Sequence, residues 1–150
     1  MARRNARILA FQALFSWDVG GTPIEDVLQF NWTEKLVSPM DMDEEPVEKS
    51  SKQTEEETFA RFLVSGAVEH IQEIDEKIAS HLQSDWSLER LNKVALAAMR
   101  LGVYEMIWQK TVDHSIVIDE AVTIAKDFSP DESYRFVNAV LDKISKESAS

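Results

Sequence analysis

The segment from Leu91 to Trp108, LNKVALAAMRLGVYEMIW, limits most strongly what this chain can fold into. Its charged residues are Lys93, Arg100 and Glu105, and apolar residues occupy most sides of its helical projection. A surface helix carries one apolar stripe, whereas a helix that is apolar on most sides lies inside a bundle. Three ionisable groups would be costly in lipid, so a membrane span is rejected. The sequence therefore predicts an all-α globular domain built around this segment.

Composition excludes several classes of site. With 150 residues and 44% hydrophobic content, the chain can form one domain with a substantial core. It has no cysteine, which excludes disulfides, thiol nucleophiles and thiolate metal sites. The apolar run behind the basic N-terminus is interrupted by polar residues, unlike a signal peptide, so we expect a cytoplasmic protein. A net charge of −11 argues against a broad nucleic-acid-binding surface, so phosphate contacts must be local.

Three arginines, Arg3, Arg4 and Arg7, stand at the start of the first predicted helix, which carries Ile8–Trp17 and ends at Gly20-Gly21. The helix macrodipole disfavours cations at an N-terminus by a few tenths of a kcal/mol each. Residues that go against a local preference, such as these cations at a helix start in an acidic protein, often mark a functional position. Two interpretations stay open from these residues alone: a frayed, solvated helix end, or a patch that contacts phosphates.

The middle of the chain predicts a long loop and a long helix. A second helix is expected from Ile24 to near Val37, followed by an exposed acidic loop over residues 38–53. We expect this loop to be disordered, because its prolines, acids and polar residues show no period. The next helix is expected to bend near Glu69-His70, and its apolar residues are Phe59, Phe62, Leu63, Gly66, Ala67, Ile71, Ile74, Ile78 and Leu82.

Capping residues and apolar spacing predict three further helix boundaries. Asp85 or Ser87 is expected to cap the central helix. The helix after it is marked by Ile116, Val117, Ala121, Ile124, Ala125 and Phe128. Ser129-Pro130-Asp131-Glu132 then opens the last helix, whose buried stripe is Val137, Val140, Leu141 and Ile144. Phe136 lies about 100° from the direction of Val137, so it is a boundary residue or an exposed aromatic.

No catalytic or metal-binding pattern stands out. His70, His81 and His114 lack the spacing of a metal site, and the four glycines form no phosphate-binding loop. The carboxylates near predicted helix starts are explained by the helix dipole. We therefore expect no catalytic residue, no metal and no cofactor, and the sequence does not indicate an enzyme.

Three blocks carry a resemblance to a known family. RRNARILAFQALFSWD, RLNKVALAAMRLGVYEM and VIDEAVTIAKDFSPDESYRFVNAVLDKI resemble the NusB family of bacterial transcription antitermination factors, over almost the whole chain except residues 38–53. The resemblance implies about seven helices arranged as two packed helical bundles. It also implies binding of single-stranded boxA RNA together with NusE, a small-subunit ribosomal protein, in a complex with other Nus factors and RNA polymerase. Members occur as a monomer or a homodimer.

The resemblance also implies a set of RNA-binding residues. They are Arg3, Arg4, Arg7, Gln12, Phe15, His81, Glu132 and Phe136. Ala95 departs from the family, which commonly carries at this position an acid that faces NusE, so this partner contact is in doubt. A few cations and aromatics on an acidic protein should bind RNA weakly, and a basic partner would then supply the missing surface.

Two other functions compete with RNA binding as an interpretation of these residues. The chain could be a helical protein–protein adaptor whose arginines only solubilise the N-terminus, and RNA-binding assays separate the two. The same fold also resembles the RNA-binding extension of an RNA cytosine methyltransferase, but no methyltransferase domain is present here.

Overall fold

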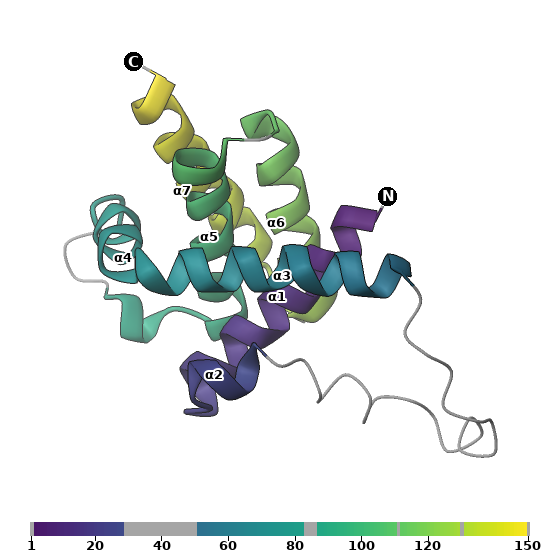
Figure 1. Cartoon of the computed structure of the whole chain (residues 1–150). Coiled ribbons are helices and arrows are strands. Elements are labelled where there is room, and N and C mark those ends of the chain that lie inside the picture. Colours follow the sequence, from purple (N-terminus) through teal and green to yellow (C-terminus); the bar gives the residue numbers. More distant parts are fainter. Residues whose placement is uncertain (1, 29–50, 83–86, 111, 130, 150) are drawn as a thin grey trace.

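The computed structural model describes residues 2–28, 51–82, 87–110, 112–129 and 131–149, and these contain helices but no β-strand (Figure 1). The α-helices are α1 (Ala2–Val19), α2 (Ile24–Val27), α3 (Ser51–Glu69), α4 (Ile71–Ala79), α5 (Lys93–Tyr104), α6 (His114–Phe128) and α7 (Ser133–Ala149). A 3-10 turn, Leu88–Arg90, precedes α5, and a π-helical segment, Glu105–Gln109, continues it. The predicted all-α class is confirmed. None of the described helices is long and apolar enough to cross a membrane.

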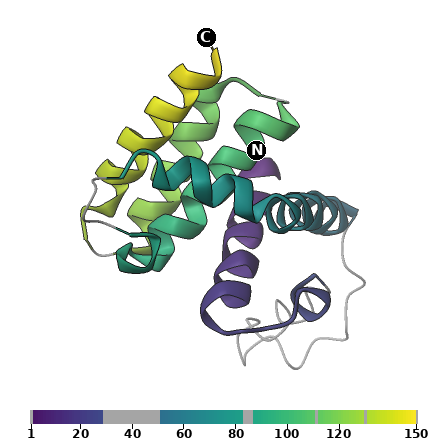
Figure 2. The same cartoon turned by 90° about the vertical axis from the view of Figure 1, so that its left-hand side faces the viewer.

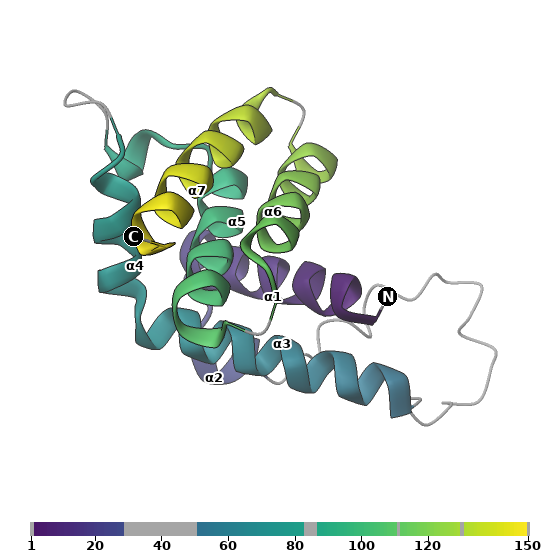
Figure 3. The same ribbon diagram turned by 90° about the horizontal axis from the view of Figure 1, so that it is seen from above.

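Helix α5 lies at the centre of the molecule and packs against α1, α3, α4, α6 and α7. The pair α1 and α3 runs across one side of α5, and α6 and α7 lie side by side on another (Figures 1 and 2). Seen from above, the C-terminal end of α7 lies close to α4, whereas the N-terminus of α1 lies on the opposite side of the molecule, nearer α6 (Figure 3). The chain thus forms one helical group from α1 and α3 and another from α5, α6 and α7.

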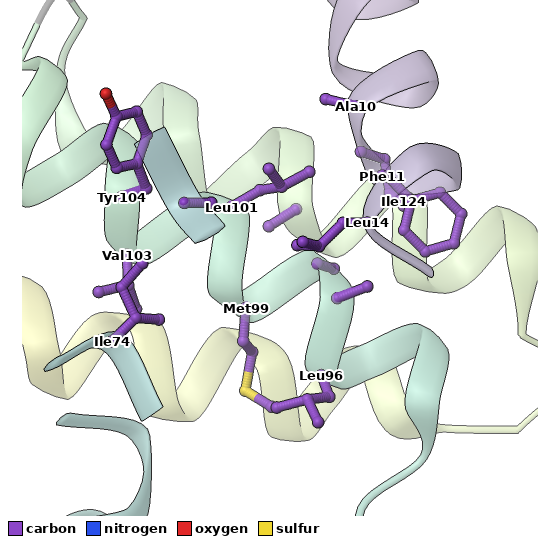
Figure 4. Packing of buried hydrophobic residues seen from close by; sticks show 14 of the residues in the cluster. Ala10, Phe11, Leu14, Ile74, Leu96, Met99, Leu101, Val103, Tyr104 and Ile124 are labelled. Atoms are coloured by element: carbon purple, nitrogen blue, oxygen red, sulfur yellow. The ribbon is translucent and has the colours of Figure 1, made fainter. Parts of the chain in front are cut away.

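The central helix is buried on nearly all sides, as its sequence predicts. Every residue from Ala95 to Tyr104 is buried, and side chains of α1, α4 and α6 surround those of α5 (Figure 4). The predicted stripe of α7 is also confirmed, because Val137, Val140, Leu141 and Ile144 are all buried. Phe62, Ile116 and Phe128 are exceptions, since these apolar positions of α3 and α6 are exposed.

Several predicted boundaries need correction. The expected bend is real, because α3 ends at Glu69 and α4 begins at Ile71. The loop predicted over residues 38–53 extends too far, because α3 already begins at Ser51. Residues 38–50 lie outside the residues that the structure describes, and so does the expected end of the second helix at Val37. Two caps are expected for α5 from its sequence: Asp85 lies outside the described residues, and Ser87 is not the cap. The cap is Asn92, whose Oδ1 accepts the N–H groups of Val94 and Ala95 at 2.8 and 3.4 Å.

A glycine lets α3 approach α5 closely. A Cβ atom on Gly66 would overlap the Cζ and Oη atoms of Tyr104. The Tyr104 ring has little room to move, because it belongs to a stack in which the ring centroids of His70 and Trp108 are 4.4 Å apart. This close packing requires a residue without a side chain at position 66.

Candidate nucleic-acid interface

Arg4 lies exposed near the start of α1 and is bound to a carboxylate of α6. Its Nε and Nη2 atoms donate to the two carboxylate oxygens of Glu120 at 3.1 and 3.3 Å, and 55% of its side chain is accessible. The hydrogen bond and charge of Glu120 raise the pKa of Arg4 above its ordinary value. Exposed ion pairs contribute little to stability, so a phosphate could share or displace Glu120 at small cost.

Arg7 has a different environment from Arg4, although the two are one turn apart. Its Nε donates to both carboxylate oxygens of Glu105 at 3.0 and 2.9 Å, and its Nη2 donates at 2.8 Å. Both side chains are almost completely buried, with 5% and 3% of their surfaces accessible. Arg7 is therefore not part of an exposed cationic patch. We correct its predicted role from phosphate contact to holding α1 against the core.

The carboxylate that binds Arg7 stands at the point where α5 changes its helical geometry. From Glu105 the helix continues as a π-helix, and the N–H of Lys110 donates to the carbonyl of Glu105 at 2.8 Å. Lys110 ends this segment in the left-handed conformation, with φ of 54°. Single-turn π segments are rare and often accompany functional positions. Here the segment coincides with the buried ion pair between α1 and the end of α5.

Two further candidates, Gln12 and Phe15, lie farther along α1. Helical geometry places Phe15 about 20° and Gln12 about 80° from the direction of Arg4, although the buried Phe11 and Arg7 also lie within this range of directions. Gln12 and Phe15 are partly accessible, and the ring of Phe15 lies 6.2 Å from that of Phe11. The side chain of Arg3 lies outside what the structure describes. The described candidates on α1 thus combine one cation, one amide and one aromatic ring.

A network of hydrogen bonds holds the turn between α6 and α7. The Nδ2 of Asn92, the cap of α5, donates to Ser129 Oγ at 3.0 Å and to Asp131 Oδ2 at 2.9 Å. Asp131 Oδ1 also accepts from Ser129 Oγ and from the N–H of Ser133, at 2.8 and 2.9 Å. Asp131 therefore accepts the first N–H group of α7. Hydrogen bonds from the side chain and backbone of Ser133, then from Ser129 and Asn92, hold the pKa of Asp131 far below its usual value.

This network positions the start of α7, where the last two candidates lie. Glu132 is exposed and pairs with Arg135 at 3.6 Å. Phe136 is partly buried and packs against the edge of the core, in contrast to the fully buried Val137 beside it. The sequence left boundary and exposed positions open for Phe136, and the structure places it at the boundary. Asn92, directly before the apolar run of α5, is the sequence signal for the cap of that helix.

His81 is not brought to the same place. Its Nε2 lies 2.6 Å from Oε2 of Glu147 near the end of α7, roughly 16 Å along that helix from Phe136 at 1.5 Å per residue. Ala95 is buried, so it offers no side-chain surface in place of the acid that the family commonly carries there. Among the described residues, no group of three His, Cys, Asp or Glu side chains could hold a metal ion.

Comparison with known proteins decides the family. The model of the NusB family matches residues 4–146. The chain belongs to the NusB family. The transcription antitermination protein NusB of Treponema denticola is 45% identical over 99% of this chain and 98% of its own length. The NusB of Solibacter usitatus is 39% identical over 97% of this chain and 90% of its own length.

Solved structures agree with this assignment. A crystal structure of the antitermination factors NusB and NusE in complex with dsRNA contains a chain that is 32% identical to this one. The match has a TM-score of 0.77 and covers 97% of each chain. The predicted resemblance is therefore confirmed, and this NusB-family chain is a transcription antitermination factor with the family's all-α fold.

The buried pair can be tested by a double-mutant cycle. Arg7→Met leaves Glu105 buried without a counter-charge and should lower the free energy of unfolding by about 3–5 kcal/mol. The double variant Arg7→Met/Glu105→Met removes both charges and should recover most of that loss. Urea unfolding measures each variant. Equal stabilities for wild type and Arg7→Met would show that the pair does not hold α1.

The turn network predicts a specific response to acid. The pKa of Asp131 is lower in the folded state than in the unfolded state. Its contribution to the free energy of unfolding is therefore complete above the unfolded-state pKa of about 3.9, and it is lost as the pH falls toward the folded-state pKa. Asp131→Asn should therefore be less stable than wild type at pH 7, and the difference should shrink below about pH 4. Urea midpoints across this range test it, with Asp119→Asn on α6 as a control. A gap that stays constant with pH would contradict the assignment.

Proposed function

We propose that this chain binds single-stranded boxA RNA together with NusE and acts, with other Nus factors and RNA polymerase, to suppress premature termination. The observation that carries the proposal is the match over 97% of both chains to the NusB of the NusB–NusE–dsRNA structure. The charge of −11 supports a role for a basic partner, because phosphate contacts need more cations than this chain offers.

The proposed RNA surface consists of Arg3, Arg4, Gln12 and Phe15 on α1 and Glu132 and Phe136 at the start of α7. Arg4 would contact a phosphate, and the two aromatic rings would stack on unpaired bases, the usual way in which single strands are read. Arg7 supports this surface from below and His81 is left out of it. The proposal includes no catalytic step, and it places the protein in the cytoplasm, where bacterial RNA polymerase works.

The experiment is a gel shift with a boxA RNA, a scrambled RNA and a duplex of the boxA sequence, each with and without NusE. The proposal expects the boxA single strand to bind best, and NusE to increase its affinity. The adaptor alternative expects binding to NusE with no preference among the RNAs. That result would overturn the proposed function.

Three variants at the start of α7 test the site within this function. Phe136→Ala should weaken RNA binding by about 1–3 kcal/mol through lost stacking, whereas Phe136→Tyr should keep most of the affinity. Glu132→Gln should tighten RNA binding, because it removes a negative charge near the proposed phosphates. RNA affinities measured with NusE present report binding, and urea midpoints of the same variants report stability. If Phe136→Ala unfolds as readily as Val140→Ala, Phe136 belongs to the core and its place in the RNA site is wrong.

A further inference from the structure

An exposed aromatic ring lies beside α1 at the end of α6, directly before the turn that leads to α7. Phe128, the last residue of α6, is 40% accessible, although its spacing predicts a core position. Its ring centroid lies 5.0 Å from that of Phe11 on α1, and Phe11 in turn contacts Phe15. Phe128 thus continues an aromatic series that begins on the α1 face with Phe15.

The same ring is tied to the turn that opens α7. Ser129 follows directly, is buried, and donates its hydroxyl proton to Asp131 within the network that positions Glu132. One side of Phe128 is therefore fixed by α1 and its backbone by the turn. Phe11 is only 3% accessible, so the support beneath the ring is rigid. A ring held in place before binding loses little conformational freedom when a ligand stacks on it.

We infer that Phe128 is a further base-stacking residue, which binds an unpaired RNA base between the α1 face and the start of α7. This inference rests on the proposed function and extends its site. A base needs only one flat aromatic face to stack on, and Phe128 is a single exposed ring at the end of α6. A protein partner would instead favour a continuous apolar patch, such as the groove that Phe59 and Phe62 form on α3.

Three variants separate stacking from packing. Phe128→Leu keeps an apolar side chain against Phe11 but removes the aromatic face, so it should weaken boxA RNA binding by about five- to 150-fold, with NusE present. Phe128→Tyr keeps the face and should bind like wild type. Phe62→Leu replaces a more exposed ring, 60% accessible, on another helix and should bind the RNA like wild type when NusE saturates both proteins. Urea midpoints confirm that all three fold.

A fluorescent base reports the contact directly. 2-Aminopurine, placed in turn at each position of the boxA RNA, should change its emission on binding wild-type protein at one position where Phe128→Leu gives no change. Wild-type affinity of Phe128→Leu, or an identical emission profile for both proteins, overturns the inference. A loss confined to NusE binding, measured without RNA, also overturns it and makes Phe128 a protein contact.

The controls distinguish this inference from the function on which it rests. If wild type does not prefer boxA over the scrambled RNA, the proposed function fails and the inference fails with it. If wild type shows that preference and Phe128→Leu shares its affinity, only the inference fails.

Discussion

The buried ion pair between Arg7 and Glu105 joins the N-terminal helix to the end of the central helix. A bidentate guanidinium–carboxylate contact has fixed geometry, and removing either partner would leave an uncompensated buried charge. The pair therefore sets how far α1 is rotated and where it lies along α5. That rotation decides which side chains of α1 face outward. Arg4, Gln12 and Phe15 keep part of their surfaces accessible, whereas Arg7 is buried.

The second charge inside the central helix has a similar function. Arg100 donates to both carboxylate oxygens of Asp75 on α4, at 2.9 and 3.0 Å, and pairs with Asp18 near the end of α1 at 3.2 Å. The two buried charges of this helix segment, Arg100 and Glu105, thus hold α1 near its two ends. The apolar surface supplies most of the driving force for packing, whereas these pairs specify which helices meet and in what register.

Local periodicity predicted much of this structure. It identified the central helix, the break at His70 and the buried stripe of α7, because each depends on the spacing of apolar residues along one segment. It failed where a contact joins distant segments. The sequence could not show that Arg7 meets Glu105, that the side chain of Asn92 binds Asp131, or that Phe128 lies beside Phe11. Among the candidate site residues, the family resemblance found the helices, but tertiary packing separated Arg7 and His81 from the rest.

The central claim is that the buried Arg7 is structural, while the exposed Arg4 can exchange Glu120 for an RNA phosphate. Side-chain Nε–H resonances of the ¹⁵N-labelled protein, followed while boxA RNA and unlabelled NusE are added, test it most directly. The account predicts that the Arg4 resonance shifts as a phosphate competes with Glu120, while those of Arg7 and Arg100 stay in place. A shift of Arg7 as large as that of Arg4, or an Arg4 resonance that does not move at saturating RNA, would contradict the account.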